Sequence, residues 1–205
     1  MSSTDAEIQL VAFDLGGVMF AEGTGAFIST FPADEQAVVR EILKGPESMQ
    51  LRRGRLAEDE FWSWAEPNLP AGWTVPSFRR GWYDAYARDE QIFSIVARMA
   101  SRTRLAVFSG NVRSRVEYLD QRDPFRHFFD TEIFSYEVGW TKPEPEFVDA
   151  FLSAVDCPPE AIAYVDDKSA ALAPALDRGV HGVLYRAPDI ATVITTLEGL
   201  GLSTS

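Results

Sequence analysis

The feature of this sequence that most restricts its fold is a series of short apolar runs that alternate with helical patterns. The runs have few polar positions, as in the strands of a parallel sheet that is covered on both faces. They occupy residues 8–14, 104–108, 132–134, 161–165 and 180–184. We therefore predict an α/β fold, built on a doubly wound parallel sheet.

Segments with apolar residues at helical spacing separate these runs. In the helix over 33–44, Asp34 and Glu35 occupy the first turn and Gly45-Pro46 is expected to end it. Asn111 is expected to cap a helix that runs to about residue 120. The remaining helices are predicted over 57–66, 76–88, 90–101, 144–155, 169–178 and 189–199.

The stretch 20–88 departs from the alternation, because it has helical patterns but no clear buried strand. We interpret it as an all-helical cap, inserted into a core formed by residues 1–19 and 89–205. Such an insertion can cover the carboxyl ends of the strands, where open α/β sheets bind ligands. We expect its tryptophans to serve mainly as the cap's own small core. They are Trp62, Trp64, Trp73 and Trp82.

Polar residues follow the apolar runs where the strands are expected to end. Asp14 ends the first run, Ser109 follows the second, and Asp166 and Asp167 follow the run over 161–165. Lys142 lies in Gly139-Trp140-Thr141-Lys142-Pro143. Together they offer a nucleophile, an anion-binding hydroxyl, a cation and an acid pair that suits a metal. This set predicts phosphoryl transfer through an aspartyl-phosphate.

Four motifs in this order resemble the haloacid dehalogenase-like (HAD) hydrolase superfamily over nearly the whole chain. The helical cap is also similar, and the Asp-Leu-Gly opening resembles small-cap phosphatases that act on sugar phosphates. The resemblance implies a Rossmann-like core and Mg²⁺-dependent hydrolysis of a phosphomonoester on a small metabolite such as a sugar phosphate. The motifs are Phe13-Asp14-Leu15-Gly16-Gly17-Val18, Ser109-Gly110-Asn111, Lys142-Pro143-Glu144-Pro145 and Val165-Asp166-Asp167.

Roles for individual residues follow from this chemistry. Asp14 is expected to attack phosphorus, and Lys142 to neutralise the phosphate and Asp14. The Ser109 hydroxyl and the amides of Gly110 and Asn111 are expected to bind the phosphate at the start of a helix.

A magnesium site is predicted from the carboxylates. Asp14 and Asp166 are the expected side-chain ligands, and Asp167 is a further ligand or an orienting residue. The resemblance implies one more ligand, the backbone carbonyl of Gly16.

Gly16 is also a departure from the resembled phosphatases, which usually have a second aspartate two residues after the nucleophile. That aspartate protonates the leaving group and activates water, which is worth roughly 10²–10⁴ in rate. We therefore predict a preference for leaving groups that depart as anions, as in sugar 1-phosphates and acyl phosphates. Glu22, on the following segment, is a weaker candidate for the missing acid.

Two basic segments have open interpretations. Lys168 follows the acid pair where the resembled branch usually has asparagines, and it either binds phosphate, weakens the metal site or is a solvated helix residue. Arg52, Arg53 and Arg55 surround Gly54 in the cap, as a solvated turn or as a contact for an anionic substrate.

Three other functions compete with this prediction. Gly16 and Lys168 favour a relative that has lost activity and serves as a binding or regulatory protein. A carbon–halogen hydrolase needs no metal and fits the acid pair less well. A response regulator would carry its acid pair early and its phospho-acceptor in the middle, the reverse of this chain.

Bulk properties restrict the partners. The net charge of −12 argues against a nucleic-acid backbone as partner. No apolar run approaches the ~18 residues of a membrane span, and residues 1–7 lack the pattern of a signal peptide. With Cys157 as the single cysteine, we expect a reducing, cytoplasmic setting. The expected partner is a small phosphorylated metabolite, and the sequence leaves the oligomeric state open.

Overall fold

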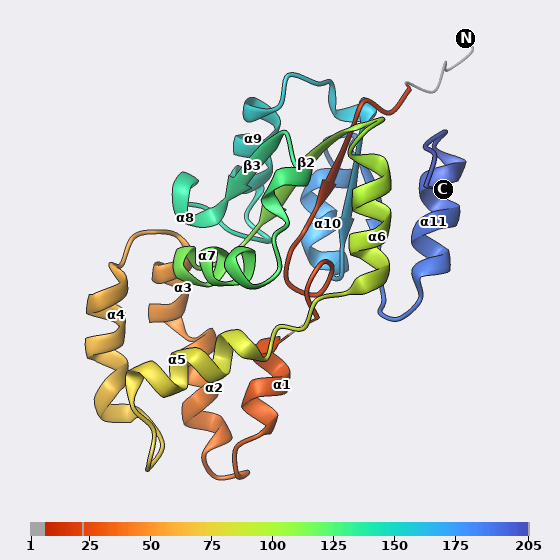
Figure 1. Cartoon of the computed structure of the whole chain (residues 1–205). Helices are drawn as coiled ribbons and strands as arrows, with labels where there is room; N and C mark the ends of the chain where they lie inside the picture. The colour runs from red at the N-terminus through yellow and green to blue at the C-terminus, as the bar shows by residue number, and fades with distance from the viewer. Residues whose placement is uncertain (1–6, 22, 205) are drawn as a thin grey trace.

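The computed structural model describes residues 7–21 and 23–204 (Figure 1). Within these ranges, the strands form one parallel sheet in the order β3-β2-β1-β4-β5. The predicted α/β fold is thus confirmed, and each apolar run forms a strand within two residues of its expected bounds. The strands are β1 (Leu10–Phe13), β2 (Arg104–Ser109), β3 (Thr131–Phe134), β4 (Ile162–Asp166) and β5 (His181–Leu184).

The helices form two groups (Figure 1). One group lies between β1 and β2 in sequence, beyond the end of the sheet at which β1 ends. It comprises α1 (Gly23–Ser29), α2 (Gln36–Lys44), α3 (Pro46–Arg52), α4 (Glu58–Ala65), the 3-10 turn Glu66–Asn68 and α5 (Val75–Asp84). The other group surrounds the sheet. It comprises α6 (Glu90–Met99), α7 (Arg113–Arg122), α8 (Ser135–Val138), α9 (Pro145–Ala154), α10 (Ser169–Leu176), α11 (Ile190–Gly199) and the 3-10 turns Arg126–Phe128 and Pro159–Ala161.

Successive strand residues point to opposite faces of the sheet, and both faces are covered. Leu10 and Ala12 of β1 pack on the face that α9 and α10 cover. Val11 and Phe13 pack on the opposite face, with apolar residues of α6, α7 and α11. Burial on both sides explains why the strands are almost continuously apolar.

The cap helices are attached through two segments that run side by side. Phe20 forms β-bridges with Gly16 and Arg88, and the Ala21 amide donates to the Ala87 carbonyl at 2.7 Å. The chain therefore leaves and re-enters the core at neighbouring points. These points lie next to the carboxyl end of β1, so α1–α5 are placed over the strand ends.

Aromatic residues form the interior of the cap, as expected. The rings of Phe27, Phe31, Trp73 and Phe78 contact one another, and Trp62 packs against Trp82 with ring centroids 6.3 Å apart. Such edge and tilted contacts stabilise a core beyond the area they bury.

Some helix bounds differ from the prediction. α2 begins at Gln36 instead of residue 33, and α5 ends at Asp84 because residue 88 pairs with Phe20. Gly45 ends α2 as expected, but Pro46 begins α3 at once, since proline suits the first turn of a helix. The sequence patterns did not predict α1, α3 or α8.

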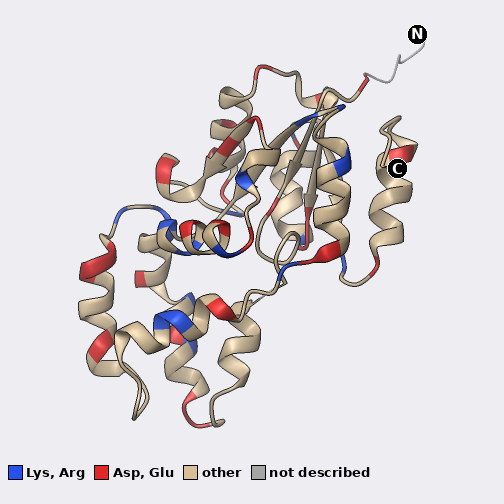
Figure 2. Ribbon diagram, in the orientation of Figure 1, with Lys and Arg blue, Asp and Glu red and all other residues tan. Residues whose placement is uncertain are grey.

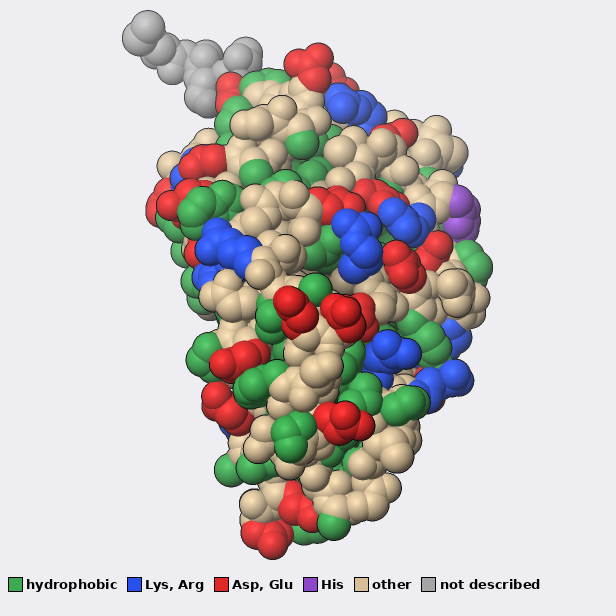
Figure 3. Space-filling model, turned by 90° about the vertical axis from the view of Figure 1, so that its left-hand side faces the viewer, with side chains coloured by type: hydrophobic (Ala, Val, Ile, Leu, Met, Phe, Trp, Pro, Cys, Tyr) green, Lys and Arg blue, Asp and Glu red, His purple; other side chains and the backbone are tan. Residues whose placement is uncertain are grey.

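Charge is distributed unevenly along the molecule. Acidic side chains are spread over the face in Figure 3, in keeping with the net charge of −12. Several Lys and Arg residues lie where the cap helices meet α7 (Figure 2). In the described ranges, no helix has the length and apolarity that crossing a bilayer requires.

Candidate active site

Asp14 occupies the end of the central strand. Its amide donates to the Val165 carbonyl at 3.0 Å, which continues the ladder between β1 and β4. Its side chain is 10% exposed, and its Oδ1 accepts the Leu15 amide at 2.8 Å. The carboxylate is thus fixed in orientation at the edge of a buried sheet.

Lys142 joins this carboxylate to the end of β4. Its Nζ lies 3.0 Å from Asp14 Oδ1 and 2.6 Å from Asp166 Oδ2. The loop that carries Lys142 is held by Glu144, whose carboxylate accepts the Thr141 amide at 2.9 Å. Glu144 in turn pairs with Arg53 of the cap at 2.9 Å. The position of Lys142 therefore depends on both the core and the cap.

The acid pair follows β4 directly. Asp166 is fully buried, accepts the Lys168 amide at 2.8 Å and also accepts the Tyr164 hydroxyl. Asp167 is half-buried, and both its oxygens accept from Lys168 Nζ, at 2.9 and 3.1 Å. One carboxylate oxygen from each of Asp14, Asp166 and Asp167 lies within 4.8 Å of the others. The structure brings together the three acids that the sequence predicts as metal ligands.

The charges of this cluster depend on one another. Burial raises the pKa of Asp14, Lys142 opposes that shift, and Asp166 adds to it. Burial also acts to raise the pKa of Asp166, but Lys142 together with the hydrogen bonds from Tyr164 and the Lys168 amide outweighs it, and the pKa lies below the ordinary value. Burial acts to lower the pKa of Lys142, and the two carboxylates more than reverse it. Lys142 and Asp166 are therefore charged at neutral pH. A third carboxylate, Asp167, has its pKa raised by burial.

The segment after β2 lies against Asp14. The Ser109 side chain is buried, and its hydroxyl hydrogen-bonds to Asp14, which acts to lower the pKa of that carboxyl. A Cβ at Gly110 would lie 2.6 Å from Thr141 Oγ1, so a larger residue here would require the Thr141 side chain to move.

Asn111 lines the cavity next to the segment that follows β2. Its amide donates to Ser135 Oγ at 3.0 Å, and its binding of phosphate stays a prediction. Its side chain does not cap α7 at the usual positions, because Val112 is the N-cap residue. Asn111 Oδ1 instead accepts the Val112 amide at 2.9 Å and Arg115 Nε at 2.8 Å.

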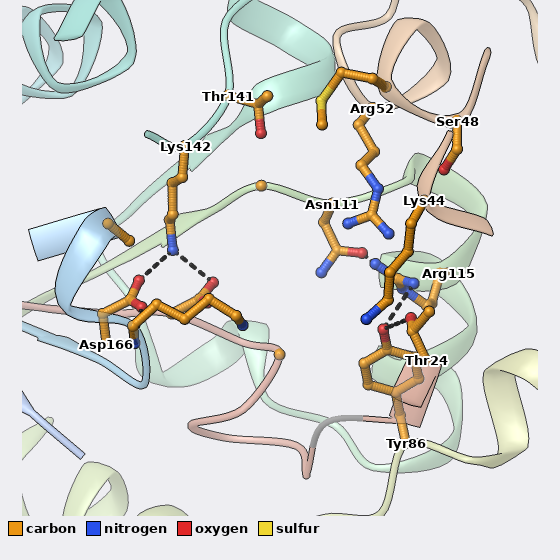
Figure 4. Close-up of a pocket in the computed structure, with 16 residues that line it drawn as sticks. Thr24, Lys44, Ser48, Arg52, Tyr86, Asn111, Arg115, Thr141, Lys142 and Asp166 are labelled. Carbon is orange, nitrogen blue, oxygen red and sulfur yellow. Dashed lines mark hydrogen bonds and ion pairs between the residues drawn. The ribbon is translucent and has the colours of Figure 1, made fainter. Parts of the chain in front are cut away.

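A cavity of about 280 Å³ opens between these strand ends and the cap (Figure 4). Among its lining residues are the predicted Asp14, Gly16, Lys142 and Asp166, together with Lys168, which also binds Asp167. Sequence reasoning missed most of the rest. These are Thr24, Lys44, Ser48, Met49, Tyr86, Arg115, Thr141 and Ala171.

The basic cluster of the cap is divided between two roles. Arg52 lines the cavity, whereas Arg53 pairs with Glu144 and Arg55 donates to the Gly139 carbonyl at 2.7 Å. The cluster is therefore not simply a solvated turn, because it links the cap to the Lys142 loop. Glu22, considered above as a substitute acid, lies outside the described residues.

Both the sequence and the fold of this chain have counterparts among known proteins. No protein-family model matches the sequence. An uncharacterised protein of Dictyostelium discoideum is 31% identical over 153 residues, or 71% of this chain. The matched region spans 66% of that relative, slightly less than two thirds of its length.

Two solved structures resemble most of this chain. One is described as a predicted HAD-like family hydrolase from Porphyromonas gingivalis, with a TM-score of 0.74 and 22% identity over 94% of this chain and 98% of that one. The other is a HAD family enzyme from Bacteroides thetaiotaomicron, solved with magnesium and inorganic phosphate. Its TM-score is 0.74 at 17% identity, over 89% of this chain and 96% of that one. This chain therefore has the fold of the HAD-like hydrolase superfamily.

Proposed function

We propose that this protein is a Mg²⁺-dependent phosphomonoester hydrolase that acts through an aspartyl-phosphate. The observation that carries the proposal is the placement of Asp14, 3.0 Å from Lys142, beside the acid pair that follows β4. A carboxylate nucleophile, a cation and further carboxylates at one sheet edge are the groups that this chemistry needs.

In the proposed reaction, an Asp14 carboxylate oxygen attacks phosphorus and the bond from phosphorus to the ester oxygen breaks. The leaving group departs as its oxyanion and takes a proton from solvent. Water then attacks the phosphorus of the aspartyl-phosphate and loses a proton to solvent, the bond from phosphorus to the Asp14 oxygen breaks, and inorganic phosphate is released. Lys142 supplies positive charge beside the transferred group. The Ser109 hydroxyl donates to Asp14 in this structure, and we propose that it donates to a phosphate oxygen when substrate is bound.

The residues present fit a magnesium ion. Carboxylate and carbonyl oxygens are the ligands that Mg²⁺ prefers, and Asp14, Asp166, Asp167 and the Gly16 carbonyl offer them. Lys168 Nζ contacts both oxygens of Asp167, which suits an orienting role for that residue, and we propose Asp14 and Asp166 as the direct ligands. When bound, Mg²⁺ would neutralise charge on the phosphate. The magnesium and phosphate in the Bacteroides thetaiotaomicron structure support this proposal.

Gly16 limits the proposed substrates. The cavity wall next to Asp14 has no carboxyl group at this position, so the ester oxygen must leave with little protonation. Anomeric sugar phosphates and acyl phosphates meet this requirement better than alkyl phosphates. A sugar phosphate is the substrate class that we favour.

Phosphate release from a panel of phosphorylated metabolites tests the proposal. We expect release that requires MgCl₂ and that is lost in Asp14→Asn, with anomeric and acyl phosphates ranked above glycerol phosphate. Asp149→Asn is a matched control, because Asp149 is exposed on α9 and pairs with Arg178 away from the cavity. Trapping of a phosphorylated peptide that contains residue 14 would identify the intermediate.

The second candidate is a binding or regulatory protein with this fold but without turnover, which the absence of an acid at Gly16 favours. Equal phosphate release from the native and Asp14→Asn proteins, for every member of the panel, would replace the phosphatase proposal with this one.

A further inference from the structure

A buried arginine faces the end of the cavity that is remote from Lys142. Arg115 lies on α7, its side chain is 1% exposed, and it lines the cavity. Its Nε donates to Asn111 Oδ1 at 2.8 Å, and one terminal nitrogen donates to the Tyr86 hydroxyl at 3.0 Å. The other terminal nitrogen makes no hydrogen bond within residues 7–21 and 23–204.

The partners of Arg115 are all neutral. Besides the amide and the phenol, the rings of Trp82 and Tyr86 flank its guanidinium, with centroids 4.7 and 4.5 Å from Cζ. No carboxylate pairs with it in the described part of the chain. A buried charge without a counter-ion is costly to a folded protein, and an anionic ligand would remove that cost. A planar guanidinium also suits a carboxylate or phosphate.

Two cap residues extend this positive region. Lys44 of α2 and Arg52 of α3 line the same cavity, and Figure 4 shows both near Arg115 and Tyr86. Lys142 and Asp166 lie on the opposite side of the view. Among the described residues that line this cavity, basic ones outnumber acidic ones, although the chain as a whole carries a net charge of −12.

Small polar groups complete the remote end. Thr24 Oγ1 contacts the Tyr86 hydroxyl and accepts the Trp82 indole at 2.9 Å, so it is already oriented. Ser48 and Asn111 also line the cavity. Hydrogen-bonding groups around a guanidinium are typical of sites that recognise an anion with a defined geometry.

We infer that the substrate carries a second anionic group, a carboxylate or a phosphate, and that Arg115, Lys44 and Arg52 bind it. This inference rests on the proposed function, because Asp14 and Lys142 are taken to bind the phosphoryl group. It assigns the two ends of the cavity to the two anionic groups of one small molecule. The cap then selects substrates through charge as well as shape.

Binding of phosphonates, which this chemistry does not hydrolyse, tests the inference. Calorimetry with MgCl₂ present would compare alkylphosphonates with ω-carboxyalkylphosphonates and alkyl bisphosphonates, for chains of two to five carbons. We expect the Kd to fall by about tenfold or more for at least one chain length when the second anion is added. The carboxylate and bisphosphonate series distinguish the two kinds of second anion.

Substitutions in the cavity show which residues produce the gain in affinity from the second anion. Lys44→Met with Arg52→Met should abolish most of the gain in affinity, as should Arg115→Met, while binding of the plain alkylphosphonate stays within about twofold. Arg40→Met is the matched control, because Arg40 is exposed on α2 and does not line the cavity. The cap double variant keeps the test valid if Arg115→Met fails to fold.

The outcomes separate this inference from the proposed function. Equal affinities for the alkyl and ω-substituted phosphonates at every chain length would overturn the second-anion site and leave the phosphatase proposal intact. A gain in affinity that survives both the Arg115 and the cap variants would also overturn it. Failure of every phosphonate to bind would overturn both proposals.

Discussion

Tyr86 packs against Gly16: its Cε1 atom lies 3.5 Å from the place that a Cβ would take at Gly16. The hydroxyl of Tyr86 hydrogen-bonds to Thr24 and accepts a hydrogen bond from Arg115. The ring of Tyr86 therefore connects the nucleophile loop to the remote end of the cavity. A distance of 3.5 Å is an ordinary van der Waals contact, and Gly16 does not have a left-handed backbone conformation. The space beside Asp14 therefore accepts a Cβ at position 16.

Gly16→Asp should introduce the acid–base group that this chain lacks. We expect kcat for glycerol phosphate to rise by roughly 10²-fold, because alkoxide leaving groups gain most from protonation. Gly16→Asn has the same shape without the acid and should show no such increase. Steady-state kinetics on glycerol phosphate and a sugar 1-phosphate would measure the effect. If the two variants have equal kcat on the alkyl ester, the missing acid does not limit the reaction.

Gly17→Ala should destabilise the protein and disturb Asp167. Gly17 has φ +88°, and a Cβ there would lie 2.4 Å from the Asp167 carboxyl carbon. Gly72→Ala is a matched control, since Gly72 has φ +86° but nothing within 4 Å of the added atom. We expect Gly72→Ala to lower the free energy of unfolding by about 1–2 kcal/mol, and Gly17→Ala by about 1–3 kcal/mol more. Equal losses in urea denaturation would show that Asp167 moves away without cost.

Lys142→Met should make the stability of the fold depend on magnesium. Without the ammonium, Asp14 and Asp166 are buried and unpaired, and losing one partner of such a network costs about 3–5 kcal/mol. A divalent cation can replace the lost charge, so MgCl₂ should raise the Tm of the variant more than that of the native protein. EDTA should remove this gain.

Lys168→Met supplies the comparison for that experiment. The Lys168 side chain is 55% exposed and pairs with Asp167, so its loss should change the free energy of unfolding by less than about 1 kcal/mol. If MgCl₂ raises the Tm of the native protein and of Lys142→Met by the same amount, the result would contradict metal binding at Asp14 and Asp166.

Much of the core of this site follows from the sequence. Asp14 and Asp166 end neighbouring parallel strands, so their meeting at one sheet edge is a consequence of β1 pairing with β4. Continuous apolar runs identify such strands without knowledge of their neighbours. Their order in the sheet then brings the carboxylates together.

The remote end of the cavity could not be predicted in the same way. Arg115 belongs to a helix whose sequence, Arg113–Arg122, is mostly polar and is typical of a solvated surface. Its burial results from packing against Trp82 and Tyr86, which come from the far end of the cap insertion. The spacing of Asn111 and Arg115, one helical turn apart, is the one local signal that links them. α3 was missed because Gly45-Pro46 ends one helix and begins the next.

The ion pair between Arg53 and Glu144 should couple the cap to the position of Lys142. Arg53 Nε and Nη2 contact the two Glu144 oxygens at 3.0 and 2.9 Å, and both side chains are less than a quarter exposed. A two-point pair of this kind is stronger than a single contact, so a double-mutant cycle with Arg53→Met and Glu144→Gln should give a coupling of about 1 kcal/mol or more.

The pair between Arg80 and Asp84 on α5 is the matched reference for this cycle. It is largely exposed and spans one helical turn, so its coupling should be about 0.3–0.5 kcal/mol. Because Glu144 also accepts the Thr141 amide, Arg53→Met should lower kcat as well as stability, whereas Arg80→Met should leave kcat unchanged. If the two cycles give the same coupling and both arginine variants keep full kcat, the Lys142 loop holds its position without the cap, and the cap acts on the reaction only through the residues that line the cavity.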